Sequence, residues 1–136
     1  MHERWSALKA QGMVMVLSTI TMPAHIDASG HIPGGWLLLK VDQAGAVLPS
    51  GHFGRPAVLS GLTAVQMLAR PGLGEHVSFF ARPLRMEGQL AEMRIEGWGE
   101  DGEQAAPRLL IRATACFVPG EVQVPENLFP GSFPRT

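Results

Sequence analysis

An apolar stretch over residues 35–48 constrains the fold most, because it is predicted to be a helix with almost no polar face. It begins at the second residue of the pair Gly34 and Gly35 and is expected to stop at Pro49 and Gly51, which break helices. A helix of this kind must be surrounded by other elements that hide its side chains from water. The rest of the chain is therefore expected to wrap around it.

The sequence predicts strands before and after this helix, and these strands can form the layer that surrounds it. An apolar, β-branched run predicts a strand over residues 13–22, which Pro23 ends. Further strands are predicted near residues 57–68, 76–84, 89–98 and 108–118. The separators RMEG and GEDGEQAAP are typical of hairpin loops, so these later strands are expected to form an antiparallel meander. The pattern predicts an α+β fold, with a curled antiparallel sheet of about five strands around one long helix. A free sheet edge favours a dimer with a continuous sheet.

Length and composition indicate one domain over residues 1–136, with an N-terminal segment, 1–12, and a proline-rich tail, 119–136, expected to lie extended. A net charge of -1 without blocks of like charge predicts neither nucleic-acid nor membrane binding. No apolar run reaches membrane-spanning length, and the N-terminus lacks a signal-peptide pattern. Cys116 is the one cysteine, which excludes an intramolecular disulfide. We expect a cytoplasmic protein.

Asp42 is the acidic residue inside the apolar helix. Burying an unpaired carboxylate costs several kcal/mol, so another interaction or a function must compensate. Lys40, two positions away, projects from a different side of a helix. A distant arginine or a wet gap would explain Asp42 structurally, and catalysis would explain it functionally.

The sequence PGG at the start of the helix suggests a second functional element. The first turn exposes free N–H groups, and with the helix dipole these can stabilise an oxyanion that forms on a carbonyl. The glycines can also serve only a sharp turn and close packing. Gly35 and Asp42 are seven positions apart, or roughly 10 Å along a helix, so one small carbonyl could not easily meet both. If both serve one reaction, Asp42 should come from one subunit and the N–H donor from its partner.

The stretch TITMPAHIDASGHIPGGWLLLKVDQAGAV resembles the segment MP...N..G.IFGGW....D..GA of hot-dog-fold acyl-CoA thioesterases, in the branch of broad-specificity acyl-CoA hydrolases. The positions in register are Met22, Pro23, Gly30, Ile32, Gly34, Gly35, Trp36, Asp42, Gly45 and Ala46. Weaker similarities follow at HFGRPAV and RPGLGEHV. The resemblance is best over about residues 13–55.

This resemblance implies that the protein hydrolyses acyl-CoA to the free acid and CoA. It implies Asp42 as the general base or nucleophile, and Gly35, less strongly Gly34, as oxyanion donors. It also implies a hot-dog homodimer, or a tetramer or hexamer built from such dimers. Coenzyme A enters as part of the substrate, and no other cofactor and no metal is expected.

The chain departs from the family pattern in the loop before the helix. Asp27 and Ser29 stand where the family often has Asn, and His31 replaces an acidic residue. We expect these three, with Trp36, to contact substrate. The spacing of His25, Asp27 and His31 does not match a common zinc motif.

Arginines are expected to contact the phosphates of CoA, with Arg70 and Arg85, beside turns, as the candidates. The other arginines of the later strands, Arg82, Arg94, Arg108 and Arg112, are expected to be solvated charges on the outer face.

Two other functions remain open at this point. The altered loop is compatible with a non-catalytic module that binds acyl-CoA. An acid and a histidine in one loop, Asp27 and His31, would suit an enoyl-thioester hydratase on the same fold.

Overall fold

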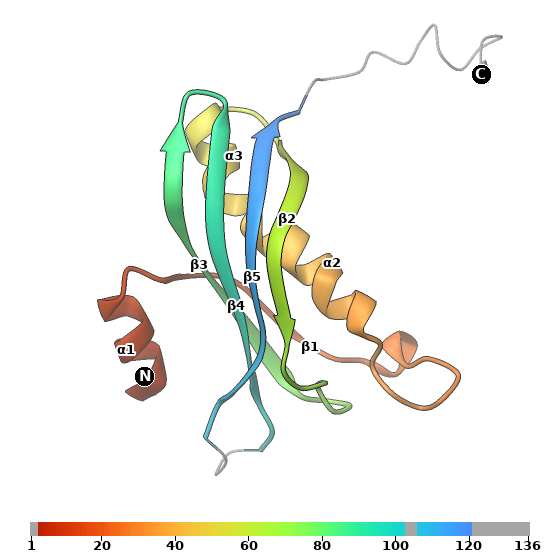
Figure 1. The fold of residues 1–136 in the computed structure, drawn as a ribbon. Coiled ribbons are helices and arrows are strands. Elements are labelled where there is room, and N and C mark those ends of the chain that lie inside the picture. Colours follow the sequence, from red (N-terminus) through yellow and green to blue (C-terminus); the bar gives the residue numbers. More distant parts are fainter. Residues whose placement is uncertain (1–2, 103–105, 121–136) are drawn as a thin grey trace, which may run out of the picture.

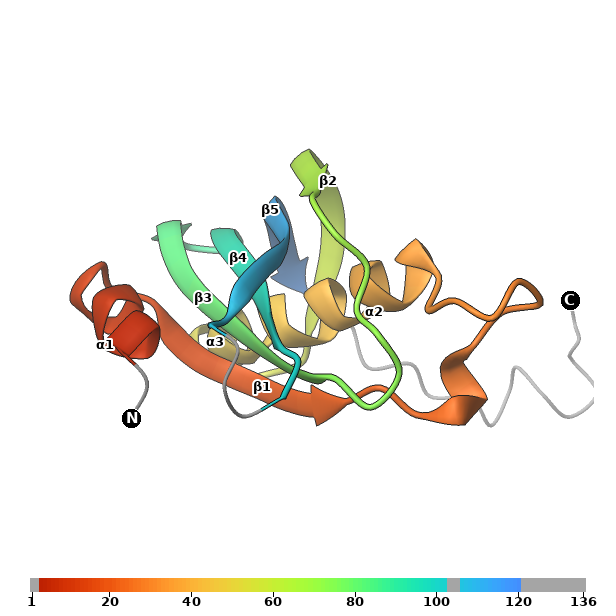
Figure 2. The ribbon, with the colours of Figure 1, turned by 90° about the horizontal axis from the view of Figure 1, so that it is seen from below.

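The computed structural model describes residues 3–102 and 106–120, and within them five antiparallel strands form one sheet in the order β1-β3-β4-β5-β2. The strands are β1 (Val14–Ile20), β2 (Ala57–Met67), β3 (His76–Glu87), β4 (Leu90–Glu100) and β5 (Arg108–Pro119). The helices are α1 (Glu3–Ala10), η1 (Pro23–His25), α2 (Gly34–Gly45) and α3 (Val47–Phe53). Figures 1 and 2 show the sheet curving around α2, which confirms the predicted α+β fold.

The helix does not stop at Pro49, so that prediction was wrong. The break falls at Ala46, and Pro49 is the third residue of α3. Proline is tolerated there because the first N–H groups of a helix have no partner within it. Pro49 has no N–H to bond the carbonyl of Gly45, which places the interruption one turn before the proline rather than at it.

The strand order differs from a simple meander at one strand. β3, β4 and β5 are consecutive neighbours, as predicted, with a tight turn at Gly88 and Gln89. The predicted pairing of β2 with β3 was wrong, because β2 pairs with β5 at the far edge. The segment after β2 crosses the end of the sheet, where the N–H groups of Leu68 and Ala69 bond to the carbonyl of Leu110.

The main core lies between α2 and the concave face of the sheet. Its fully buried residues include Leu37, Val41, Phe79, Met93, Ile95, Ile111 and Phe117. Gly45 allows the helix to approach, because a Cβ there would lie 2.6 Å from Cζ of Phe117. A substitution at Gly45 would push α2 off the sheet.

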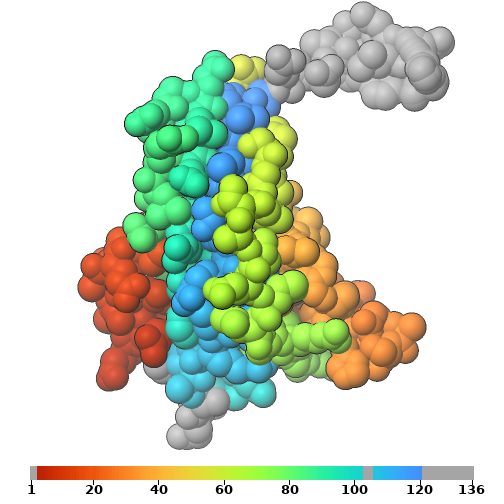
Figure 3. All heavy atoms as spheres, viewed as in Figure 1, coloured from red at the N-terminus to blue at the C-terminus, as the bar shows by residue number. Residues whose placement is uncertain are grey.

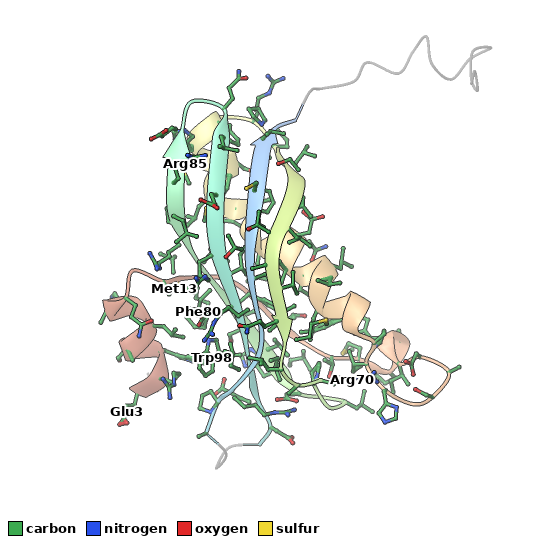
Figure 4. All side chains as sticks on the ribbon, viewed as in Figure 1. Glu3, Met13, Arg70, Phe80, Arg85 and Trp98 are labelled. Atoms are coloured by element: carbon green, nitrogen blue, oxygen red, sulfur yellow. The ribbon has the colours of Figure 1, made fainter. Side chains whose placement is uncertain are left out.

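The N-terminal segment, to which the sequence assigned no structure, forms α1 and covers part of the outer face. Leu8 is buried in a small cluster with Met13, Phe80 and Trp98. The ring of Trp5 packs against Phe80, with ring centroids 4.9 Å apart. Figure 4 shows Met13, Phe80 and Trp98 close to this helix.

One side of α2 stays open in a single chain, contrary to the expectation of a helix enclosed on all sides. Leu39 is 51% exposed on this side. Leu62, Val65 and Met67 of β2 are also exposed, although they pair with core-facing residues of β5. A single sheet covers only one side of a helix. The apolar side chains on the other side of α2 and on β2 therefore stay exposed at this edge of the sheet.

The described helices include none with the length and apolar character needed to span a membrane.

Candidate active site

Asp42 lies on the open side of α2. Helical periodicity places it on the same stripe as Gly35 and Leu39. Asp42 is half-buried, and its carboxylate has no hydrogen-bond or ion-pair partner among residues 3–102 and 106–120. The Nζ of Lys40 instead donates to Gln43 at 3.3 Å, so Lys40 does not explain the acid.

The two glycines at the start of α2 have different surroundings. A Cβ on Gly34 would lie 2.8 Å from Cε of Met67, so packing against β2 explains Gly34. A Cβ on Gly35 would meet nothing within 4 Å, and Gly35 is exposed. Neither N–H group bonds to a backbone carbonyl in the described part of the chain, whereas the next N–H, of Trp36, donates to the carbonyl of Pro33 at 3.0 Å. Gly35 is therefore an open N–H donor at the positive end of a helix.

A cavity of about 350 Å³ adjoins this helix start. Its lining residues are Gly34, Met67, Leu68, Ala69 and Arg70. The cavity combines an apolar wall from the end of β2 with the side chain of Arg70, an exposed cation. Of the two arginines predicted to meet CoA, the structure brings Arg70 to the site and places Arg85 toward the other end of the sheet (Figure 4).

The segment that carries Arg70 is fixed by a buried carboxylate that sequence reasoning did not single out. The side chain of Glu75 is 0% exposed and accepts hydrogen bonds from Nη2 of Arg108 at 2.8 Å and from Nε at 3.3 Å. These bonds raise the pKa of Arg108 above its ordinary value. The same Nη2 donates to the carbonyl of Arg70 at 3.0 Å, so the ion pair also holds the backbone at the cavity. The expectation that Arg108 is simply a solvated charge was wrong.

Thr21 fastens the other end of this segment to the end of β1. Its hydroxyl donates to the carbonyl of Gly72 at 2.6 Å and accepts the N–H of Glu75 at 3.1 Å. Thr21 and Glu75 are both 1% exposed, so these bonds are shielded from water. The acid in the RPGLGEHV motif was a signal in the sequence for this clamp.

The loop before α2 forms a closed hydrogen-bond network. Oδ1 of Asp27 accepts from the Oγ and N–H of Ser29, at 2.6 and 2.9 Å, and from the N–H of His31 at 3.1 Å. The Ser29 hydroxyl and then the His31 N–H are the main causes that lower the pKa of Asp27. Oγ of Ser29 also lies 3.0 Å from Nδ1 of His31. The network makes these three residues the internal support of the loop.

Trp36 occupies the core rather than the open stripe. Its ring centroid lies 5.6 Å from that of His25 in η1, and Nζ of Lys40 lies 5.5 Å from the ring centroid of Trp36. Trp36 is 7% exposed, and its Nε1 has no hydrogen-bond partner in the described structure. Within one chain Trp36 and Asp42 therefore face different sides of α2.

Comparisons with solved structures agree with the arrangement of the sheet around α2. The hexameric thioesterase y2039 from Yersinia pestis superposes with a TM-score of 0.73 at 25% identity, over 78% of this chain and 91% of that one. A hexameric hotdog fold thioesterase of Campylobacter jejuni superposes with a TM-score of 0.70 at 19% identity, over 79% and 83%. The chain has the hot-dog fold. The fold that the resemblance implied is thus confirmed.

A relative in sequence supports the likeness to acyl-CoA thioesterases. The acyl-CoA thioester hydrolase YciA of Escherichia coli is 31% identical over 84 residues, which are 62% of this chain and 64% of that protein. The match therefore spans less than two thirds of the relative's length. No family model matches the chain. The likeness to acyl-CoA thioesterases, seen first in the helix motif, is confirmed by these relatives.

Proposed function

We propose that the protein hydrolyses acyl-CoA thioesters, with the carboxylate of Asp42 as general base or nucleophile and the N–H of Gly35 as oxyanion donor. The observation that carries this proposal is the open stripe of α2, where neither group has a partner among the residues that the structure describes. The relatives named as thioesterases in E. coli and Y. pestis support the same class of reaction.

The chemistry needs a bound thioester whose carbonyl oxygen accepts a hydrogen bond from Gly35 N–H. That bond and the helix dipole stabilise the negative charge that develops on the oxygen. Asp42 then either takes a proton from a water that attacks the carbonyl carbon, or attacks it directly to form a mixed anhydride that water hydrolyses. Both routes break the C–S bond and release a carboxylic acid and the CoA thiol.

The reaction is proposed to take place between two copies of the chain. Gly35 and Asp42 are about 10 Å apart along α2, farther than one carbonyl can bridge. Leu39 is an exposed apolar residue of this stripe, and the exposed Leu62 and Val65 lie on β2, an edge strand of the sheet. A dimer that pairs two β2 strands would cover these side chains and bring Asp42 of one protomer toward Gly35 of its partner.

The loop geometry favours thioester hydrolysis over hydration of an enoyl thioester. A hydratase would use Asp27 and His31, but Oδ1 of Asp27 is engaged by three donors of its own loop, and His31 is exposed. The carboxylate of Asp42, in contrast, has no partner within residues 3–102 and 106–120. We place the reacting carboxylate at Asp42 for this reason.

The experiment measures thiol release from acyl-CoAs of several chain lengths, with wild type, Asp42→Asn and Glu92→Gln. The last variant removes the same charge from the outer face, away from α2. Asp42→Asn should lower kcat by about 10²- to 10⁴-fold and Glu92→Gln should retain activity. Binding of acyl-CoA without any thiol release by wild type would favour the non-catalytic module, and a 3-hydroxyacyl product would favour the hydratase.

A further inference from the structure

The outer face of the sheet holds a second polar site, across β4, β5 and β2. These strands lie side by side in the view of Figure 3. Arg94 of β4 is directly opposite Thr114 of β5, and Arg112 of β5 is directly opposite Gln66 of β2. A pocket of about 230 Å³ opens here. Its lining residues are Ala64, Gln66, Arg94, Arg112, Ala113 and Thr114.

Arg94 lines this pocket with an unsatisfied hydrogen-bond donor. Its Nε is buried and has no hydrogen-bond partner in the described part of the chain. A buried donor without a partner is costly, and more so on a charged group. Arg82 of β3 is directly opposite Arg94, and two like charges in a cross-strand pair destabilise a sheet. Neither arginine forms an ion pair with a described acidic residue.

Arg112 is oriented toward the pocket from its other side. Its Nε donates to Oε2 of Glu96 at 3.4 Å, and Oε1 of Glu96 accepts from Nε1 of Trp98 at 3.1 Å. The indole thus fixes Glu96, and Glu96 fixes the stem of Arg112. The terminal NH2 groups of Arg112 have no partner among residues 3–102 and 106–120. The expectation that Arg112 is only a solvated charge was therefore wrong.

We propose that this pocket binds a phosphate group. Two guanidinium groups, an amide and a hydroxyl converge on it, and guanidinium groups bind phosphate oxygens in pairs of parallel hydrogen bonds. On this outer face the three positive charges of Arg82, Arg94 and Arg112 outnumber the two negative charges of Glu92 and Glu96, so the face attracts an anion. The pocket is several times larger than the roughly 30 Å³ that one water occupies.

The phosphate can belong to a free phosphate compound or to the nucleotide end of CoA, and only the second source rests on the proposed function. Calorimetry with inorganic pyrophosphate tests the site without any catalysis. The variants are Arg94→Gln, Arg94→Lys and Gln66→Ala, with Lys9→Gln on α1 as a control that removes one positive charge elsewhere. Far-ultraviolet circular dichroism verifies that each variant is folded.

Wild type and Lys9→Gln should bind pyrophosphate with equal affinity, and more weakly as salt rises. Arg94→Gln should weaken binding by about 10- to 100-fold, and Gln66→Ala, on an exposed edge strand, by about tenfold. Arg94→Lys should bind between wild type and Arg94→Gln, because it keeps the charge and loses the paired hydrogen bonds. If wild type shows no saturable binding, or if the folded Arg94→Gln and Gln66→Ala variants bind like Lys9→Gln, the proposal is overturned.

KM values distinguish the two possible sources of the phosphate group. They are measured for butyryl-CoA and for the butyryl thioester of pantetheine, which lacks the nucleotide. If the nucleotide end of CoA is the ligand, Arg94→Gln raises KM for butyryl-CoA and leaves KM for the pantetheine thioester unchanged. If a free phosphate compound is the ligand, pyrophosphate binding falls in this variant and both KM values stay unchanged. Either result supports the phosphate pocket.

Discussion

Asp42 and Gly35 share one open stripe of α2 and are separated by about 10 Å along the helix axis. Neither group is used by the fold of a single chain, since the carboxylate has no partner in the described structure and a Cβ on Gly35 would meet nothing within 4 Å. A carboxylate and an open helix N-terminus are what thioester hydrolysis needs. Their separation is the reason that the proposed site takes one group from each of two chains.

Gly35 offers a test of the oxyanion donor, because proline removes the N–H and alanine keeps it. Proline is tolerated in the first helical turn. Gly35→Pro should lower kcat by about 10²- to 10³-fold, the usual effect of losing one oxyanion donor. Gly35→Ala adds a methyl group and keeps the donor, so it should be clearly more active than Gly35→Pro. Equal activities of the two folded variants in the thiol-release assay would exclude the N–H as the cause.

Gly35 and Gly45 should respond differently to alanine in thermal unfolding. Alanine at Gly35 has free space and a helix propensity better than glycine by up to about 1 kcal/mol, so the free energy of unfolding should stay the same or rise. Alanine at Gly45 would place its Cβ 2.6 Å from Cζ of Phe117, so the free energy should fall by about 1–3 kcal/mol. A destabilised Gly35→Ala would show that the fold itself needs this glycine.

Removing Arg108 from its ion pair with Glu75 should lower the free energy of unfolding more than removing Glu75. Arg108→Gln leaves a fully buried carboxylate without its cation, which should cost about 3–5 kcal/mol. Glu75→Gln leaves an arginine that is 45% exposed and can be solvated, so the loss should be smaller, about 1–3 kcal/mol. Urea denaturation of the two variants gives the comparison, and a larger loss for Glu75→Gln would contradict it.

The loop network predicts an Asp27 carboxyl with a pKa below the ordinary value of 3.8, chiefly because of the Ser29 hydroxyl and then the His31 N–H. Because the pKa is depressed in the folded state, the stabilisation is present above the unfolded pKa and is lost as the pH falls through the folded pKa. The loop should therefore keep its structure at neutral pH and loosen only in acid. NMR titration of the carboxyl carbon should show the low pKa in wild type and a higher one in Ser29→Ala. The same pKa in both proteins would remove Ser29 as the cause.

Much of the fold was readable from the sequence because its elements have clear periods. The long apolar helix, the strand runs and the RMEG turn each followed from local patterns. The place of β2 did not, because pairing with β5 rather than β3 depends on how residues 68–75 cross the end of the sheet. The break at Ala46 was also not predicted, because the hydrogen bond that Pro49 cannot form lies one turn before the proline.

The candidate site was predictable only in part. The sequence indicated an acid, Asp42, and a glycine pair, Gly34 and Gly35, in an apolar helix. The structure adds that close packing against Met67 requires a glycine at position 34, whereas no contact requires one at position 35. Glu75 and Glu96 are deeply buried acids, and the sequence did not predict their ion pairs. The motif RPGLGEHV contains Glu75, but the partners, Arg108 and Arg112, are distant in the sequence. Long-range ion pairs become visible only when the strands are placed.

The central claim is that each active site takes Asp42 from one chain and Gly35 from its partner, and mixed oligomers test it most directly. Chains with Asp42→Asn and chains with Gly35→Pro are unfolded, combined in equal amounts and refolded together. If the two residues of a site come from different chains, half of the dimers are mixed and each has one intact site. Activity per chain should then recover to about a quarter of wild type. If both residues came from the same chain, no intact site could form, and the mixture would stay at the average of the two inactive parents, which would contradict the account.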